Sequence, residues 1–231
     1  MKKAALHNLG CKVNAYETEA MQHLLEEAGY EIVPFTQKAD VYVINTCSVT
    51  NMADRKSRQM LHKAKKNNPD SIVVAAGCYV QTSEKEVLND LSVDIVIGND
   101  RKHDLVRLLE EYSLDSVNDT VDDINDGKHD FEELFIDQTK EHTRAFIKVQ
   151  DGCNQFCSYC IIPYARGRVR SRRFENVIAE VERLAANGFK EVVLTGIHLS
   201  SYGVDFEEAV KTGRMNDQMA VELFLMKYSK Q

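Results

Sequence analysis

The sequence predicts an α/β protein whose first half is an open parallel sheet with helices on both faces. Short continuous apolar runs, such as those at 41–44 and 72–76, are typical of strands buried on both faces. Stretches with helical spacing of apolar residues separate these runs, and alternating strands and helices predict a parallel sheet. The composition, 43% hydrophobic and 28% charged over 231 residues, is that of an ordinary globular protein.

The individual elements follow from local signals. Apolar residues recur at helical spacing in the stretch 16–28, and Gly29 ends this helix. A polar helix at 52–66 is closed by an Asn-Asn-Pro sequence, since a residue before proline leaves the helical region. The expected elements are strands at 3–9, 41–44, 72–76 and 93–97, with helices at 16–28, 52–66, 84–91 and 105–112.

The charge balance excludes some classes of protein. With 29 basic and 36 acidic side chains, the net charge is −7, which does not suit a basic nucleic-acid coat or a polybasic membrane binder. The first residues include two lysines but no apolar run of signal-peptide length, and no later stretch is apolar for long enough to cross a membrane. We therefore expect a soluble, cytoplasmic protein with no membrane partner.

Six cysteines divide into two groups of three. A reducing cytosol disfavours disulfides, so metal binding or redox chemistry is the better interpretation. Cys11, Cys47 and Cys78 each follow the last apolar residue of a predicted strand, and such positions share one edge of an open parallel sheet. The alternative is that each is a small buried hydrophobe, which is less favoured for three cysteines at equivalent positions. Three converging thiolates suit zinc or an iron–sulfur cluster.

The segment 113–142 is expected to be an acidic linker. Between 115 and 133 it carries eight acidic residues against a single lysine, which is typical of a solvated connector, and we assign it no chemistry. A strand at 144–149 then begins a second unit.

The second group of cysteines forms a C-x₃-C-x₂-C motif directly after this strand. Cys153, Cys157 and Cys160 can hold three corners of a cube-shaped iron–sulfur cluster and leave the fourth iron open to a ligand. The alternative is a zinc-bound regulatory protein. Structural zinc normally takes four protein ligands, whereas the nearest downstream histidine, His198, lies beyond a separate strand.

This spacing resembles the radical S-adenosylmethionine superfamily. The resemblance implies that the open iron binds the amino and carboxylate groups of S-adenosylmethionine, whose reductive cleavage gives a 5′-deoxyadenosyl radical. It also implies that Tyr159 lies against the adenine, although loop packing is an equal alternative. By the same resemblance Thr195 and Gly196, which follow a predicted strand, contact the methionine amino group, but a glycine there is common in any α/β loop.

The two groups together resemble the radical S-adenosylmethionine methylthiotransferases over residues 3–206. The matching segments are Gly-Cys-Lys-Val-Asn at 10–14, Asn-Thr-Cys-Ser-Val-Thr at 45–50, Gly-Cys-Tyr at 77–79 and residues 152–173. The first of these, with Leu-Thr-Gly-Ile-His at 194–198, is most similar to the branch acting on N6-threonylcarbamoyladenosine in tRNA. The isopentenyladenosine branch is the alternative. The implied fold is an N-terminal open parallel-sheet methylthiotransferase domain followed by the start of a radical S-adenosylmethionine partial (βα) barrel.

The resemblance implies two [4Fe–4S] clusters, one on each group of cysteines. The cluster at 153–160 generates the radical, and that on Cys11, Cys47 and Cys78 supplies sulfur to C2 of adenosine 37 in the tRNA anticodon stem-loop. A second S-adenosylmethionine provides the methyl group. The chemistry also requires a sulfur donor and an electron donor, which no motif identifies, and no catalytic acid–base pair is expected.

Five arginines lie in eight residues after the cysteine loop, which suggests contact with tRNA phosphates. They are Arg166, Arg168, Arg170, Arg172 and Arg173. The alternative is a solvated basic face paired with the acidic linker. The basic helix at 52–66 is a poorer candidate.

The resemblance ends at residue 206. We expect an N-terminal domain at 1–112, the linker at 113–142, an incomplete barrel at 143–206 and a divergent tail at 207–231. With two barrel strands visible, the chain alone is expected to be weak or inactive. The alternative is a non-enzymatic metal-binding or tRNA-binding remnant.

Overall fold

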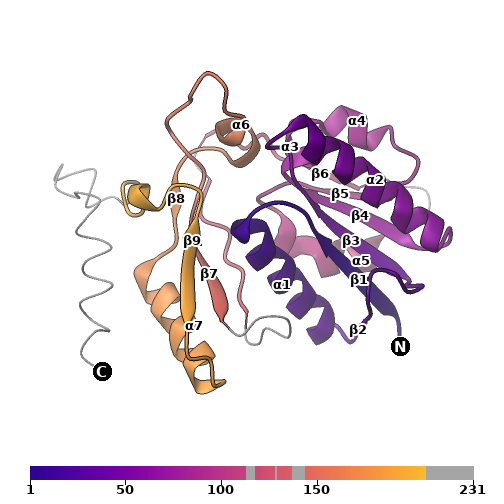
Figure 1. Ribbon diagram of the computed structural model, residues 1–231, viewed down its shortest axis with the longest axis horizontal. Helices are drawn as coiled ribbons and strands as arrows, with labels where there is room; N and C mark the ends of the chain where they lie inside the picture. Colours follow the sequence, from indigo (N-terminus) through magenta and orange to yellow (C-terminus); the bar gives the residue numbers. More distant parts are fainter. Residues whose placement is uncertain (113–117, 128, 137–143, 207–231) are drawn as a thin grey trace.

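A computed structural model of the chain describes residues 1–112, 118–127, 129–136 and 144–206. It contains two sheets, a six-stranded one in the order β2-β1-β3-β4-β5-β6 and a three-stranded one in the order β8-β7-β9 (Figure 1). All strand pairs of the larger sheet are parallel, which confirms the predicted fold class.

The larger sheet alternates strands with helices. Its strands are β1 (Lys3–Asn8), β2 (Glu31–Ile32), β3 (Val41–Thr46), β4 (Ile72–Gly77), β5 (Ile95–Ile97) and β6 (Asn118–Thr120). Its helices are α1 (Lys12–Glu27), α2 (Asn51–Asn67), α3 (Cys78–Thr82), α4 (Glu84–Leu88), the 3-10 turn η1 (Lys102–Asp104) and α5 (Leu105–Glu111).

Helices cover both faces of this sheet because alternate residues of each strand point to opposite sides. In β3, Val41 and Val43 pack with Leu25 of α1, while Tyr42 and Ile44 pack on the other face with α2, α3 and α4. Figure 1 shows α2 and α1 on opposite sides of the strands. The continuous apolar runs of the sequence therefore correspond to strands buried on both faces, as predicted.

The short elements of this unit differ from the sequence-based expectation. β2 and β6 were not expected, because each is only two or three residues long and carries no apolar run. Cys78 directly follows β4, as expected, and is also the first residue of the short helix α3, which was not expected. The predicted helix at 84–91 is shorter, since α4 ends at Leu88.

The second unit consists of β7 (Ala145–Asp151), α6 (Ile162–Arg166), β8 (Arg170–Ser171), α7 (Phe174–Ala186), β9 (Val192–Gly196) and the 3-10 turn η2 (Leu199–Ser201). β7 and β9 are parallel and correspond to the two expected barrel strands, and α7 packs on them through Val177 and Leu184. β8 is an additional strand, antiparallel to β7. The expected tail at 207–231 lies outside the described residues.

The acidic segment is not a solvated connector where the structure describes it. β6 adds a strand to the edge of the large sheet. Further on, Leu134 and Ile136 are buried against Tyr16 and Ala20 of α1. The expectation is wrong because it counted charges and overlooked the apolar residues between them. Its parts at 113–117, 128 and 137–143 lie outside the described residues.

None of the helices in the described part of the chain is long and apolar enough to span a membrane.

The packing of α1 on the sheet predicts the effect of a core substitution. Leu25 is fully buried against the β strands, so Leu25→Ala should lower the free energy of unfolding by about 2–5 kcal/mol. Leu91→Ala is the matched control, because Leu91 is 96% exposed, and should change it by less than about 0.5 kcal/mol. Urea denaturation measures both, and equal effects would contradict this packing.

Candidate active site

The first three cysteines lie at one edge of the large sheet. Cys11 is the N-cap of α1 just beyond β1, Cys47 follows β3, and Cys78 follows β4. Because β1, β3 and β4 are neighbours and parallel, their carboxyl ends meet at the same edge. Cys47 and Cys78 are buried and Cys11 is exposed. The three positions therefore share one edge of the sheet, as the sequence predicted.

The thiols of this N-terminal trio lie within electrostatic reach of one another. Burial raises the pKa of the Cys47 thiol, and the charges of Cys78 and Cys11 raise it further against a hydrogen bond from the Val49 backbone. Gly10 has a positive φ of 109°, and a Cβ there would lie 3.0 Å from the Cys47 sulfur. Glycine at this position therefore allows the Cys11 loop to approach Cys47 closely.

Asn14 connects the ends of two strands beside these thiols. Its Nδ2 donates to the carbonyl oxygens of Leu9 and Thr46 over 2.8 and 2.9 Å. The Cys11 sulfur donates to its Oδ1 over 3.6 Å. Asn14 is buried and belongs to the Gly-Cys-Lys-Val-Asn motif, so the motif carries a structural asparagine in addition to its cysteine.

The C-x₃-C-x₂-C loop follows the end of β7, as predicted. The Cys153 backbone N–H donates to the Gly167 carbonyl over 3.0 Å, and that of Cys160 donates to the Cys157 carbonyl over 2.9 Å. Gly152 is required because its φ is +69° and a Cβ there would lie 1.9 Å from a backbone oxygen of Arg168. Cys153 and Cys160 are half-buried and Cys157 is exposed. The loop is therefore fixed at its start and open to solvent at its middle.

The three residues expected to contact S-adenosylmethionine lie on two different elements. Tyr159 is 91% exposed on the cysteine loop. Thr195 and Gly196 end β9, and Gly196 pairs with Gln150 at the end of β7, just before the cysteine loop. Gln150 accepts a hydrogen bond from the His198 backbone over 2.7 Å, which ties these two strand ends together.

Three of the five arginines expected to bind RNA are buried in ion pairs, so the prediction is wrong for them. Arg166 and Arg172 have no exposed surface, and Arg170 is 4% exposed and paired with Asp100. A guanidinium already buried against a carboxylate is not available to a phosphate. Arg168 and Arg173 are exposed and contact the rings of Phe156 and Phe206.

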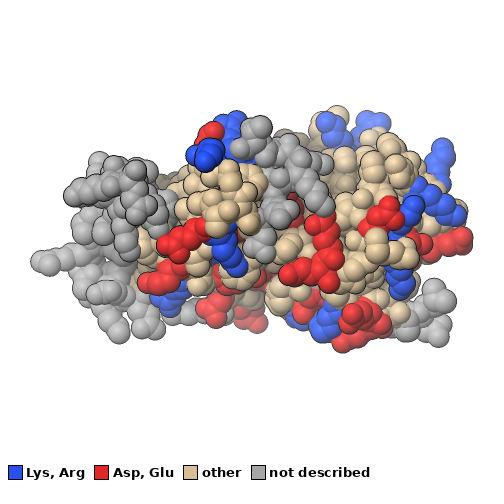
Figure 2. All heavy atoms as spheres, turned by 90° about the horizontal axis from the view of Figure 1, so that it is seen from below, with Lys and Arg blue, Asp and Glu red and all other residues tan. Residues whose placement is uncertain are grey.

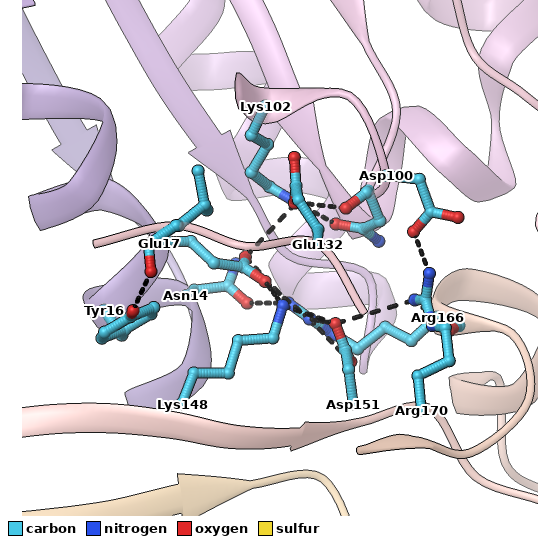
Figure 3. A network of polar contacts seen from close by, with 12 residues as sticks. Asn14, Tyr16, Glu17, Asp100, Lys102, Glu132, Lys148, Asp151, Arg166 and Arg170 are labelled. Carbon is cyan, nitrogen blue, oxygen red and sulfur yellow. Dashed lines mark hydrogen bonds and ion pairs between the residues drawn. The ribbon is translucent and has the colours of Figure 1, made fainter. Parts of the chain in front are cut away.

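A buried network of charges lies between the two sheets. Glu17 of α1 pairs with Arg166 of α6 at 2.9 Å, Lys148 of β7 at 2.7 Å and Lys102 of η1 at 3.4 Å. Asp151, the last residue of β7, pairs with Lys148 at 2.6 Å and Arg166 at 3.0 Å. Figure 3 shows the side chains of Lys148 and Arg166 pointing toward both carboxylates.

The network keeps its charges despite complete burial. Burial alone raises the pKa of Glu17, but Arg166, Lys102 and Lys148 together hold it well below its usual range. In the same way, burial lowers the pKa of Arg166, and the charges of Asp151, Cys78 and Glu17 outweigh this. Arg166 also donates to Oδ1 of Asn14 over 2.7 Å, so the network reaches the N-terminal trio.

A second buried pair joins α7 to the acidic segment. Arg172 pairs with Glu180 of α7 and with Glu133 at 2.8 Å. Tyr16 of α1 donates to the Leu134 carbonyl over 2.5 Å and to Glu180 over 3.2 Å. Burial raises the pKa of Glu180, and the charge of Arg172 offsets only part of this effect. Sequence patterns missed Tyr16, Glu133 and Glu180 and the buried role of Arg172, because a linear pattern does not reveal whether a polar side chain is buried.

Charged residues are mixed on the surface shown in Figure 2, where acidic and basic side chains are spread over both units. This face of the described residues offers no continuous basic surface for a nucleic acid. Within the described ranges, no three His, Cys, Asp and Glu side chains are close enough to hold a single metal ion.

Comparison with family models finds two matches in the order that the sequence suggested. Residues 3–98 match the model described as "Uncharacterized protein family UPF0004", and residues 147–222 match that of the "Radical SAM superfamily".

Several relatives with assigned activities are similar to most of the chain. It is 47% identical to the threonylcarbamoyladenosine tRNA methylthiotransferase MtaB of Bacillus subtilis (strain 168), over 90% of this chain and 46% of that protein. It is 46% identical to MtaB of Aquifex aeolicus (strain VF5), over 88% of this chain and 50% of that one. A tRNA-2-methylthio-N(6)-dimethylallyladenosine synthase of Thermoanaerobacter sp. (strain X514) is 34% identical, over 91% of this chain and 45% of that one. The chain thus spans about half the length of these relatives.

Among solved structures, the radical S-adenosylmethionine methyltransferase TsrM of Kitasatospora setae is similar in fold. The form with cobalamin and a [4Fe-4S] cluster bound aligns with a TM-score of 0.61 at 13% identity, over 100% of this chain and 52% of that one. At this identity the likeness concerns the fold alone.

The burial of Arg172 predicts a difference between two adjacent arginines. Arg172→Ala leaves Glu180 buried without its cation and should lower the free energy of unfolding by about 3–5 kcal/mol. Arg173→Ala removes an exposed guanidinium and should change it by less than about 0.5 kcal/mol. Denaturant titration at neutral pH compares them, and a similar small loss in both would mean that the Arg172 pair is not buried.

Proposed function

This chain belongs to the radical S-adenosylmethionine methylthiotransferase family, and from that premise we propose that it takes part in the 2-methylthio modification of N6-threonylcarbamoyladenosine at position 37 of tRNA. The identities support this branch over the dimethylallyladenosine branch, since they are 47% and 46% for two relatives of the first kind and 34% for one of the second. The proposed partners are S-adenosylmethionine and the anticodon stem-loop of tRNA. We propose that the N-terminal domain at 1–112 also includes the described parts of the acidic segment, which add β6 to its sheet and cover α1, and that a barrel portion follows at 143–206.

Membership of this family implies S-adenosylmethionine and a [4Fe–4S] cluster, and we propose Cys153, Cys157 and Cys160 as the cluster ligands. When bound, this pair supplies a carbon radical that can remove hydrogen from an unactivated C–H bond such as C2–H of adenine. The open middle of the loop supports the assignment, because the exposed Cys157 and Tyr159 leave this part of the loop accessible to a cofactor. Tyr159 would cover the adenine, and Thr195 and Gly196 would contact the methionine portion.

We propose that Cys11, Cys47 and Cys78 hold a second [4Fe–4S] cluster. Their position at neighbouring strand ends and the mutual influence of their charges support this. In a cubane cluster each thiolate binds a different iron, so the sulfur atoms lie farther apart than around one ion. The absence of any described trio tight enough for a single ion is compatible with such a cluster.

The observation that carries the proposal is one buried network of charges that joins the elements next to the two cysteine trios. Glu17, Asp151 and Arg166 join α1, β7 and α6, the elements that precede or follow the two cysteine loops. In this way the chain's own residues would keep the sulfur-bearing site facing the site where hydrogen is removed. Excluding water from this region would protect a reactive radical.

The tRNA-binding proposal is restricted to the two exposed arginines. Arg168 and Arg173 line one cavity of about 390 Å³ together with Arg170, Asp130 and Asp205. No ion pair within the described residues engages Arg168 or Arg173, which leaves both guanidiniums available to phosphates.

Two clusters predict a characteristic iron content. After anaerobic reconstitution the wild-type chain should hold about eight irons, and replacing either cysteine trio with alanine should leave about four. The control is the chain with all six cysteines replaced, which should bind none. About one zinc per chain, or an iron content unaffected by Cys153/Cys157/Cys160→Ala, would refute the two-cluster proposal and favour a metal-binding module.

Phosphate contacts predict a salt-dependent loss of affinity. Arg168→Gln and Arg173→Gln should each weaken binding of an anticodon stem-loop RNA and reduce the slope of log K against log salt by about 1. Lys56→Gln is the control, because Lys56 is an exposed basic residue of α2 outside the arginine-rich segment 166–173. Fluorescence anisotropy at several salt concentrations gives both quantities, and an equal loss for Lys56→Gln would show that the contacts are nonspecific.

A further inference from the structure

The side-chain amide of Asn99 contacts both cysteine regions. Asn99 lies just beyond β5, at the same edge of the sheet as the N-terminal trio, and it is fully buried. Its Nδ2 donates to the Cys78 sulfur over 3.7 Å and to the Ala165 carbonyl oxygen over 2.6 Å. Ala165 belongs to α6, the helix that follows the C-x₃-C-x₂-C loop. One amide group therefore links a thiol of the first trio to the element that follows the second.

Lys102 determines the orientation of this amide. Its Nζ donates to Oδ1 of Asn99 over 2.7 Å and to the backbone oxygen of Asn99 over 3.1 Å. An ammonium group has donors and no acceptor, so Oδ1 must face Lys102 and the NH₂ group must face Cys78. Lys102 is itself buried and paired with Glu17. The backbone N–H of Asn99 donates to Gln81 over 3.0 Å, which fixes the main chain as well.

The three thiols of the trio have different partners. The Cys11 sulfur points to the oxygen of Asn14, and the Cys47 sulfur receives a backbone N–H from Val49. The partner of Cys78 is a side-chain donor whose two hydrogens are both used, one on sulfur and one on α6. A substitution at position 99 can therefore remove the hydrogen bond to sulfur without changing the backbone that carries the cysteines.

We propose that Asn99 is a positioning residue that sets the reduction potential of the N-terminal cysteine site and holds α6 against it. The inference rests on the proposed function, in which Cys78 binds a cluster. An N–H donated to a ligating sulfur stabilises the reduced, more negative state, so it raises the reduction potential. The second N–H keeps the distance between Cys78 and α6 constant, so the same side chain tunes one site and places it against the other.

The test is the midpoint potential of the N-terminal cluster alone, measured by EPR-monitored redox titration of the full chain carrying Cys153/Cys157/Cys160→Ala. In this background Asn99→Ala removes the donor, and Asn99→Asp removes it and adds negative charge. Both should lower the midpoint potential, and Asn99→Asp should lower it more. Asn68→Asp is the control, because the buried Asn68 amide donates to the Ala39 carbonyl over 2.8 Å at the opposite edge of the sheet. It should leave the potential unchanged.

An unchanged potential in folded Asn99 variants would overturn the inference, as would an equal shift in Asn68→Asp. Thermal unfolding verifies that each variant is folded. If neither Asn99 variant folds, Asn99→Leu decides, because it keeps the volume of the side chain without an N–H group and should also lower the potential. A parent chain that takes up no iron at Cys11, Cys47 and Cys78 would instead overturn the proposed function, and the inference with it.

Discussion

The buried carboxylate of Glu17 is the group on which the relation between the two sheets depends. Cations from three elements meet it, namely Lys102 of η1, Lys148 of β7 and Arg166 of α6. A charge buried without partners costs several kcal/mol, so each of these groups is tolerated only while the others are present. The docking of β7 and α6 on α1 is therefore close to all-or-none, and the cysteine loop between β7 and α6 takes its position from that docking.

The same logic explains why an arginine-rich segment of an acidic protein is not a basic surface. Arg166, Arg170 and Arg172 turn inward onto Glu17, Asp100, Asp151 and Glu180, which come from four separate parts of the chain. Buried ion pairs contribute little net stability compared with apolar packing, but they tolerate few alternative arrangements. We interpret these arginines as determinants of how the two units are oriented. Arg168 lies between two of them in the sequence and Arg173 follows the last, and both are exposed.

The sequence was sufficient for the parallel sheet and for the placement of the cysteines, because buried strands are continuously apolar and the carboxyl ends of neighbouring parallel strands coincide. The sequence was insufficient wherever the role of a polar residue depends on whether its side chain is buried. Glu17 and Asp151 look like ordinary surface acids in a linear pattern, and Asn99 belongs to no motif. Leu134 and Ile136 were hidden among acids, although they pack on Tyr16. Such contacts join residues more than a hundred positions apart, beyond the range of periodicity.

The described residues between 118 and 136 show that the N-terminal folding unit extends beyond the part of the chain that carries its three cysteines. The family model of the first unit ends at residue 98, yet the sheet of that unit is completed by β6, and its first helix is covered by Leu134 and Ile136. A fragment cut at residue 112 would keep the whole N-terminal trio but leave the edge of β5 unpaired and the apolar side of Tyr16 open to water. A chimera that exchanges this unit between homologous proteins would therefore have to include the acidic segment, because the segment is part of the folded unit and not only a linker.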